Sequence, residues 1–222
     1  MRRFMLFLLV LYLVPMACRA QVSPVRFGIH ANIISANINA TLSDIAGLPP
    51  PSNNVEVALS EVYGLGLGGG AHLDVFLGLL TLRMSADYIR ISPDAEKFNS
   101  YVSASVPGIP LVYQSGGDIN LWSGTVNGKL VVLPLPVVKP YVTGGLGLAY
   151  VKSSEVALNF NGSPLAPFPI LESQTVGTYN LGAGVDFELG FLTIYGELKV
   201  TWVMLKEGTS TYVPIGLIGV SF

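Results

Sequence analysis

The sequence has little charge, very little histidine and almost no cysteine. Only 12% of its 222 residues are charged, and it contains one cysteine and two histidines. After residue 20 it has no apolar run near the roughly twenty residues that a transmembrane helix needs. These absences exclude a disulfide framework, a basic nucleic-acid-binding face and a helical membrane protein.

The first twenty residues have the pattern of a secretory signal peptide. Arg2 and Arg3 precede the apolar run "FMLFLLVLYLVPM", and small residues stand three and one positions before Gln21. We therefore expect residues 1–20 to be removed near Ala20-Gln21, which leaves 21–222 as one domain.

Cys18 offers an alternative, because it could be acylated as a lipoprotein cysteine. Pro15 stands where such sites carry an aliphatic residue, which disfavours this reading. Cleavage would remove Arg2, Arg3 and Arg19 from the twelve basic residues and leave nine against fourteen acidic ones. The mature chain would then be mildly acidic.

The remaining composition favours β-structure that faces lipid. Half of the residues are hydrophobic, and the chain contains 25 glycines and 15 prolines, which argue against long helices. Alternation with a period of two marks eight segments, at 25–35, 62–77, 79–91, 118–132, 140–151, 176–189, 191–203 and 211–222. Long connections (36–61, 92–117, 152–175) alternate with short ones, and a brief last connection falls near "KEGTS". This pattern predicts an all-β fold, an eight-stranded antiparallel up-and-down transmembrane β-barrel.

The two faces of the predicted strands differ in polarity. One face carries apolar residues such as Ile29, Leu146 and Leu198 and has no charge, as lipid requires. The other face, which we expect inside the barrel, carries a polar network of Arg26, His30, His72, Asp74, Arg83, Asp87, Lys129, Asp186, Glu188, Glu197 and Lys199. A soluble, lipocalin-like barrel would reverse the two faces, and it remains the alternative fold.

Aromatic residues give a second test of this orientation. Six of them lie on the apolar face near the long connections, where we expect an aromatic girdle: Tyr88, Trp122, Tyr150, Tyr179, Trp202 and Tyr212. Phe27, Phe187 and Phe222 lie at the opposite strand ends. Because unpaired backbone groups in lipid are costly, the last strand should pair with the first.

The chain also resembles a known family. Its final strand, "YVPIGLIGVSF", resembles the C-terminal signature of outer-membrane β-barrel proteins. "KPYVTGGLGLAYV", "YNLGAGVDFELG" and "LTIYGELKVTW" resemble strands of the small barrels of the opacity-protein and outer-membrane-protein-A type. The resemblance implies a bacterial outer-membrane location and recognition of the strand ending in Phe222 by the barrel assembly machinery. The connections "ASVPGIPLVY" and "SPLAPFPILES" are more apolar than adhesive loops usually are.

Simple hairpin arithmetic predicts which interior residues face one another. A turn at Leu77-Gly78 would place His72 opposite Arg83, and a turn at Gly190-Phe191 would place Glu197 opposite Gly184 and Lys199 opposite Gly182. Long charged side chains would thus face glycines. Because eight strands enclose just enough room for side chains, we expect a near-neutral plug, with a gated, porin-like path as the alternative.

Catalytic and metal-binding patterns are weak. Asp186 and Glu188 could be paired acids, but on one strand they suit an ion network better. No histidine–serine pair stands at the outer end of a strand, and two separated histidines are a poor metal ligand set. "GLGLGGGAH" lacks the ending of a phosphate-binding loop. We therefore expect no enzyme activity, no metal and no cofactor.

Three functions follow as hypotheses. The first is a monomeric outer-membrane barrel with a structural or surface-interaction role. The second is passage or binding of small hydrophobic compounds through the apolar loops, and the third is a lipid-modifying enzyme. The expected partners are outer-membrane lipid and lipopolysaccharide, the barrel assembly machinery and a small hydrophobic ligand, with no nucleic acid.

Overall fold

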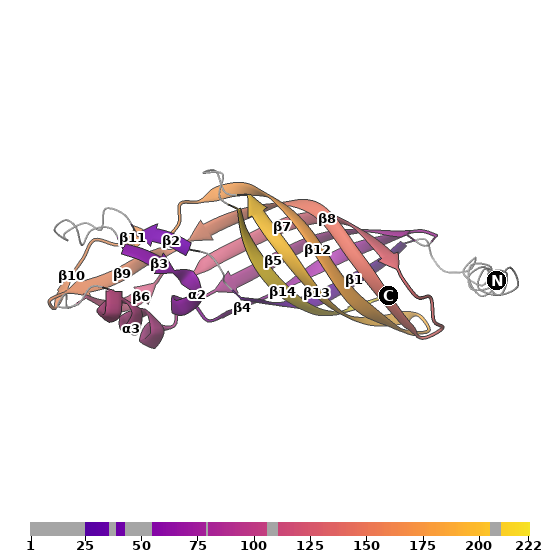
Figure 1. Cartoon of the computed structure of the whole chain (residues 1–222), viewed down its shortest axis with the longest axis horizontal. Coiled ribbons are helices and arrows are strands. Elements are labelled where there is room, and N and C mark those ends of the chain that lie inside the picture. The colour runs from indigo at the N-terminus through magenta and orange to yellow at the C-terminus, as the bar shows by residue number, and fades with distance from the viewer. Residues whose placement is uncertain (1–24, 36–38, 43–54, 79, 106–110, 205–209) are drawn as a thin grey trace, which may run out of the picture.

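Eight antiparallel strands close into one barrel (Figure 1). The computed structural model describes residues 25–35, 39–42, 55–78, 80–105, 111–204 and 210–222, so the predictions for the signal peptide and Cys18 lie outside the described residues. Around the barrel the strands are β1 (Val25–Ser35), β14 (Ser210–Ser221), β13 (Leu192–Met204), β12 (Gln174–Leu189), β8 (Val138–Ser153), β7 (Ile119–Val131), β5 (Leu80–Ile91) and β4 (Leu65–Leu77). The predicted eight-stranded up-and-down barrel is confirmed.

The seam of the barrel joins the two ends of the chain. β1 pairs with β14 from Gly28 opposite Ser221 to Ile34 opposite Ile215. Beyond the last pair, Phe27 and Phe222 exchange two backbone hydrogen bonds of 3.1 and 2.8 Å. The final strand therefore leaves no open edge beside β1, which is what closure in lipid demands.

The two ends of the barrel differ in the mass of their connections. At one end, here called the turn end, lie residues 25 and 222 and the short connections β4–β5, β7–β8 and β12–β13. At the opposite loop end, the long connections form a separate group of elements beyond the barrel (Figure 1). The predicted alternation of long and short connections holds, while the segment "KEGTS" falls mostly outside the described residues.

The turns decide the register of the hairpins. Gly78 and Gly190 have positive φ values of 78° and 69°, which glycine adopts without a steric penalty. At β12–β13 the predicted pairs are confirmed, with Glu197 opposite Gly184 and Lys199 opposite Gly182.

The predicted β4–β5 register was wrong by two residues. Arg83 lies opposite Asp74, and His72 lies opposite Ser85. The reason is the position of the turn, which lies one residue further along the chain than expected, so that Leu77 pairs with Leu80. The shift matters, since it puts Arg83 beside a carboxylate rather than beside an imidazole.

The long connections fold into structure of their own, which the sequence patterns did not predict. They hold α2 (Leu59–Val62), α3 (Ala95–Ser105), β2 (Asn39–Leu42), β3 (Val55–Ala58), β6 (Leu111–Gly116), β9 (Glu155–Phe160), β10 (Ser163–Pro164) and β11 (Phe168–Pro169). We call these elements the cap. β6 pairs with β9 although they belong to different connections. Within the described chain, neither helix is long and apolar enough to cross a membrane.

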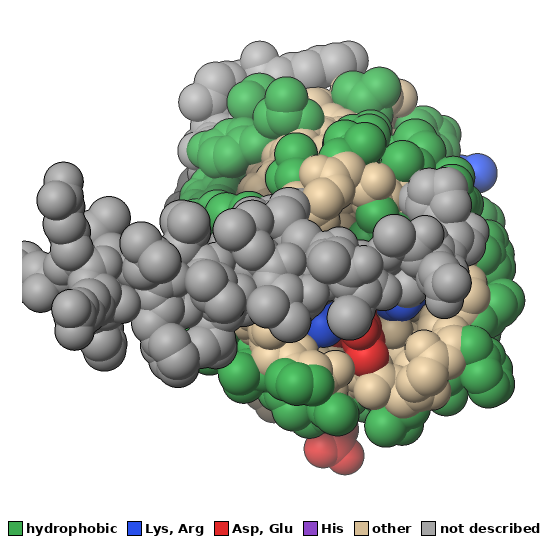
Figure 2. Space-filling model, turned by 90° about the vertical axis from the view of Figure 1, so that its right-hand side faces the viewer, with side chains coloured by type: hydrophobic (Ala, Val, Ile, Leu, Met, Phe, Trp, Pro, Cys, Tyr) green, Lys and Arg blue, Asp and Glu red, His purple; other side chains and the backbone are tan. Residues whose placement is uncertain are grey.

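The strand faces have the inside-out pattern that the sequence predicts. Leucines at 146 and 198 are 69% and 74% exposed on the outside, whereas Asp74 and Lys129 are 3% and 4% exposed inside. Figure 2 looks onto the turn end and shows hydrophobic side chains around the outside, with acidic and basic side chains in the opening. A soluble barrel would place these two sets the other way round.

Candidate functional site: the closed barrel interior

All the residues predicted for the interior polar network project into the barrel. Nine of them are buried: His30, His72, Asp74, Arg83, Asp87, Lys129, Asp186, Glu197 and Lys199. Arg26 and Glu188 lie nearer the turn-end opening, with side chains 13% and 22% exposed. The strands place them together because residues at alternate positions of neighbouring strands share one face.

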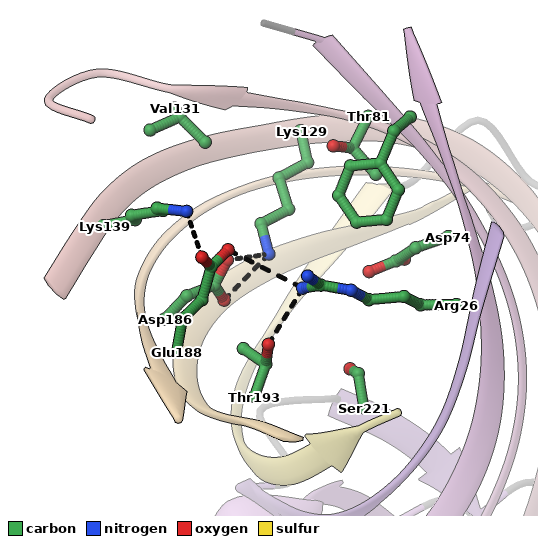
Figure 3. A pocket seen from close by; sticks show the side chains of 11 residues that line it. Arg26, Asp74, Thr81, Lys129, Val131, Lys139, Asp186, Glu188, Thr193 and Ser221 are labelled. Carbon is green, nitrogen blue, oxygen red and sulfur yellow. Dashed lines mark hydrogen bonds and ion pairs between the residues drawn. The ribbon is translucent and has the colours of Figure 1, made fainter. Parts of the chain in front are cut away.

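Ion pairs fill the turn end of the interior (Figure 3). Lys129 Nζ donates to both oxygens of Asp186 at 2.8 and 2.6 Å, and Lys139 Nζ bonds the carboxylate of Glu188. Arg26 donates to Thr193 Oγ1 at 2.9 Å and lies 3.6 Å from the same Glu188 carboxylate. Three cations and two carboxylates thus converge around the opening.

A second layer of ion pairs lies alongside these. Arg83 binds Asp74 through two hydrogen bonds of 2.7 and 2.8 Å, and another of its nitrogens lies 3.5 Å from Glu197. Tyr141 donates to that Glu197 carboxylate at 3.0 Å. Two-pronged arginine–carboxylate pairs of this type are strong and fix geometry as well as charge.

Aromatic rings separate the charged groups. Lys129 Nζ lies 3.9 Å from the centre of the Tyr141 ring, and the Arg83 guanidinium lies 4.6 Å from that of Tyr195. Desolvated cations gain energy from such ring faces. Both tyrosines are among the largest fully buried side chains of the described residues.

Sequence reasoning missed Lys139, Tyr141 and Tyr195 as members of this network. Lys139 was assigned to a turn, whereas β8 begins at Val138 and directs Lys139 inward. The tyrosines alternate in phase with the inward charges, and that phase was the signal that could have revealed them. With Lys139 included, five basic residues match five acidic ones: Arg26, Arg83, Lys129, Lys139 and Lys199 against Asp74, Asp87, Asp186, Glu188 and Glu197.

The two histidines meet inside the barrel, although sequence reasoning treated them as separated. His30 Nε2 lies 2.5 Å from Asp87 Oδ1, and His72 Nε2 lies 3.0 Å from Ser221 Oγ. Their Nδ1 atoms lie 3.4 Å apart. A continuous chain of polar contacts therefore runs from Ser221 through both imidazoles to Asp87.

This chain contains a serine–histidine pair, but its position does not suit a hydrolase. Ser221 is 3% exposed. The turn-end cavity that Ser221 lines holds about 10 Å³, which is room for about one water molecule. A nucleophile needs an acyl or phosphoryl group beside it, and no such space exists at this point of the described interior.

The loop-end half of the interior is apolar instead of charged. Inward residues of the barrel strands, such as Ile34, Ile89 and Val203, form one buried cluster with Val62 and Phe98 of the cap. We call this cluster the loop-end core; its remaining buried members are Tyr63, Ile91, Ile119, Ala149, Val151, Val156, Leu158, Ile170, Val176 and Val213. Barrel and cap thus share one hydrophobic core.

Part of the apolar "SPLAPFPILES" segment belongs to this core. Ile170 is 7% exposed, and Leu165, Phe168 and Leu171 pack against the cluster. Residues 106–110 of "ASVPGIPLVY" lie outside the described residues. These four apolar residues of the segment therefore contribute to the loop-end core.

A buried tyrosine ties the cap to the barrel. Tyr63 donates a hydrogen bond of 2.6 Å to the carbonyl oxygen of Gly117, just before β7. Burial raises the pKa of Tyr63 far above its usual value, so the hydroxyl stays protonated and remains a donor. The contact holds two long connections together above the loop-end core.

The predicted girdle residues form two rows on the outer surface near the loop end. Strand pairing aligns Tyr88, Trp122 and Tyr150 in one row, and Tyr179, Trp202 and Tyr212 in the other. The rings of Tyr179 and Trp202 stack at 5.1 Å. At the turn end, the rings of Phe27 and Phe222 meet edge to face at 5.8 Å.

Metal-binding carboxylate or cysteine clusters do not occur in the described part of the chain. No group of three or more His, Cys, Asp or Glu side chains there is arranged to hold a metal ion.

Comparisons with known proteins found similarity to solved structures alone. No protein-family model matches the sequence, and no curated protein sequence matches it. Among solved structures, Neisserial surface protein A is 16% identical, with 90% of this chain and 96% of that one covered and a TM-score of 0.45. Ail of Yersinia pestis is 12% identical over 90% of this chain and all of the other, with a TM-score of 0.43.

The N-terminal barrel domain of Pseudomonas aeruginosa OprF is 14% identical, with 89% of this chain and 97% of that one covered and a TM-score of 0.39. The classification of this chain stands on its own strand pairing and faces. It is a small eight-stranded transmembrane β-barrel. Closed antiparallel barrels with an apolar exterior are the integral proteins of bacterial outer membranes, and the chain belongs in that membrane.

Proposed function

We propose that this protein is a closed outer-membrane barrel that anchors a folded cap at the cell surface, with a structural or surface-interaction role and no catalytic activity. The supporting observation is the filling of the interior. Ion pairs occupy its turn-end half, and the loop-end core occupies the other half. Because these two sets of side chains fill the described interior, the barrel acts as an anchor.

The cap supports a surface role because it shares a hydrophobic core with the barrel. Val156 and Leu158 of β9 and Phe98 of α3 are buried in the same core as the inward residues of the strands. A cap held in this way presents a fixed surface, whereas flexible loops would lose entropy when a partner binds. In the outer membrane short turns face the periplasm, so the cap would lie outside the cell.

Two measurements test this proposal together. In planar lipid bilayers, the folded protein should show no sustained ion conductance. In intact cells, a large impermeant maleimide should label Asn161→Cys at the β9–β10 turn and should not label Leu135→Cys at the β7–β8 turn. Steady channel openings, or labelling of the second variant alone, would overturn the proposal.

Binding or passage of small hydrophobic compounds is the second candidate, because one groove favours it. An open groove of about 390 Å³ lies on the outer face near the loop end, lined by Tyr88, Trp122, Leu148 and Tyr150. Gly124 lies in it, and a Cβ added there would meet nothing within 4 Å.

The variant Gly124→Leu should therefore fill this groove without disturbing the fold. If the groove carries hydrophobic compounds, uptake of an apolar tracer should fall several-fold in this variant. Gly128→Leu, on the same strand but outside the groove, is the matched control. Equal uptake by all three proteins would reject this candidate and leave the anchor role untouched.

The lipid-modifying activity stays a prediction from resemblance alone. The His72–Ser221 pair lies inside the barrel, away from the lipid-facing surface. Incubation of the folded protein with lipopolysaccharide, followed by mass spectrometry of the lipid, tests it directly. Unchanged lipid masses agree with the non-catalytic role.

A further inference from the structure

The two histidines of the chain converge on one point, with their Nδ1 atoms facing each other. His30 of β1 and His72 of β4 place their Nδ1 atoms 3.4 Å apart, and Tyr195 Oη of β13 lies 3.3 Å from His72 Nδ1. We propose that His30 Nδ1, His72 Nδ1 and Tyr195 Oη form a binding site for a divalent transition-metal ion, with zinc as the reference ion.

The two distances from His72 Nδ1 to the other proposed ligands match those between ligands of one tetrahedral metal ion. Zinc binds histidine nitrogen at about 2.0–2.1 Å, so two tetrahedral ligands lie about 3.3–3.4 Å apart. The two contacts that His72 Nδ1 makes, at 3.4 Å to His30 and 3.3 Å to Tyr195, both have this length. A metal ion bound to His72 Nδ1 would therefore have each of the other two ligands at a suitable distance from that atom.

The far nitrogens of both rings are held as metal-binding histidines usually are. His30 Nε2 lies 2.5 Å from Asp87 Oδ1, which also accepts a 2.9 Å hydrogen bond from Asn32. His72 Nε2 lies 3.0 Å from Ser221 Oγ. Such outer partners fix the orientation of the ring and direct the opposite nitrogen to the metal. Both Nδ1 atoms thus point at the proposed site.

Glycines make room for the two rings. A Cβ at Gly70 would come within 2.7 Å of His30 Nε2, and one at Gly219 would lie 2.7 Å from both His30 Cβ and Tyr195 Cζ. Gly28 faces the His72 ring in the same way. Because rigid strands carry the site, its geometry is set before a metal binds.

Charges of both signs surround the site. Asp87 lies next to His30, whereas the Arg83 guanidinium lies 4.6 Å from the centre of the Tyr195 ring. Ligation by Tyr195 would release the phenolic proton and so offset one positive charge of the metal ion. Three protein donors leave one tetrahedral position open, as in zinc sites that keep an exchangeable ligand. The alternative without a metal is a plain hydrogen-bond chain from Ser221 through both imidazoles to Asp87.

The chain is well suited to a direct test, because it has two histidines and its single cysteine precedes the barrel. The folded protein, carrying no histidine tag, is dialysed against zinc in detergent, and bound metal is measured by mass spectrometry. We expect one zinc ion per chain. Cobalt should give the intense visible absorption of a tetrahedral site.

Variants distinguish metal binding at this site from non-specific metal binding elsewhere on the protein. His30→Asn/His72→Asn should lose the zinc, and Tyr195→Phe should weaken binding at least tenfold and change the cobalt spectrum. Asp87→Asn, which alters only the outer partner, should weaken binding by about 10- to 100-fold. Tyr88→Phe, on the outer surface, is the matched control and should bind as the native protein does.

Folding of each variant is checked by the shift in gel mobility between unheated and boiled samples in SDS. Native protein that binds no zinc would overturn the proposal and leave the hydrogen-bond chain. Undiminished binding in folded Tyr195→Phe and Asp87→Asn would overturn it as well, even if the double histidine variant does not fold. The anchor role does not depend on either result.

Discussion

The two halves of the barrel interior are filled by opposite means. In the turn-end half, charged groups such as Arg83 and Asp74 are paired at 2.7 Å, and in the loop-end half Ile89 and Val203 pack against the cap. Buried ion pairs add little net stability but are costly to break, whereas apolar packing stabilises in proportion to the area buried. The turn-end half therefore specifies one arrangement, and the loop-end half joins barrel and cap.

The largest loss of stability in the turn-end half is expected when the buried Arg83 is replaced. Arg83→Met would leave Asp74 charged and unpaired, and we expect a loss of about 3–5 kcal/mol in the free energy of unfolding. Urea titration in detergent, followed by the fluorescence of the two tryptophans, measures this loss. Replacing both partners, as in Arg83→Met/Asp74→Leu, should restore most of it.

Arg90→Met is the matched control for the buried pair. Arg90 lies on the same strand as Arg83 and also pairs with a carboxylate, Asp118, but its side chain is 58% exposed. Exposed pairs contribute little. Equal losses for Arg83→Met and Arg90→Met would mean that burial does not distinguish the two pairs.

The packing of the loop-end half can be weakened by replacing an aromatic residue of the cap. Phe98 is 2% exposed and packs on Tyr113 at 5.0 Å. Phe98→Ala should cost about 3 kcal/mol and open the cap, while the barrel stays resistant to cold SDS. Hydrogen exchange in α3 and β6 measures the opening. Val112→Ala, at a half-exposed position of β6, should leave it unchanged.

A smaller effect is expected at the contact between cap and barrel. Tyr63→Phe removes the donor to the Gly117 carbonyl and leaves that buried oxygen without its partner, which costs about 1–3 kcal/mol. Protease resistance of the cap should fall accordingly. Tyr212→Phe, at an exposed position of the girdle, serves as the control, and an equal response would contradict the assigned role of Tyr63.

The smallest expected effect is the change in stability near Asp118 as the pH is lowered. Partial burial acts to raise the pKa of Asp118, but hydrogen bonds from Ser92 and Arg90 outweigh it and hold the pKa below its usual value. A lowered carboxyl pKa stabilises the fold above the unfolded pKa, and this contribution is lost as the pH falls through the folded value, below about 4.

Protection of the cap's backbone amides from hydrogen exchange should therefore fall slightly between pH 6 and pH 3 in the native protein. Asp118→Asn should remove that part of the pH response, and high salt should reduce it, because exposed charges are screened. An unchanged pH response in Asp118→Asn would show that other groups cause it.

Sequence reasoning recovered most of the barrel because lipid imposes a simple rule on every strand. Residues such as Leu198 and Glu197 alternate between the two faces, so strand positions and facing directions could be read without a structure. The glycine turn at Gly190 even gave the correct β12–β13 register. The turn near Gly78 did not, because moving a turn by one residue along the chain shifts the register of the two strands by two.

The sequence by itself determined that this chain forms an eight-stranded barrel with charge inside and apolar residues outside, since these properties repeat along each strand. Only the tertiary structure decided how the interior is filled. The meeting of His30 with His72, the inclusion of Lys139 and the pairing of β6 with β9 depend on register and closure. These contacts join residues far apart in the chain, and no local pattern in the sequence records them.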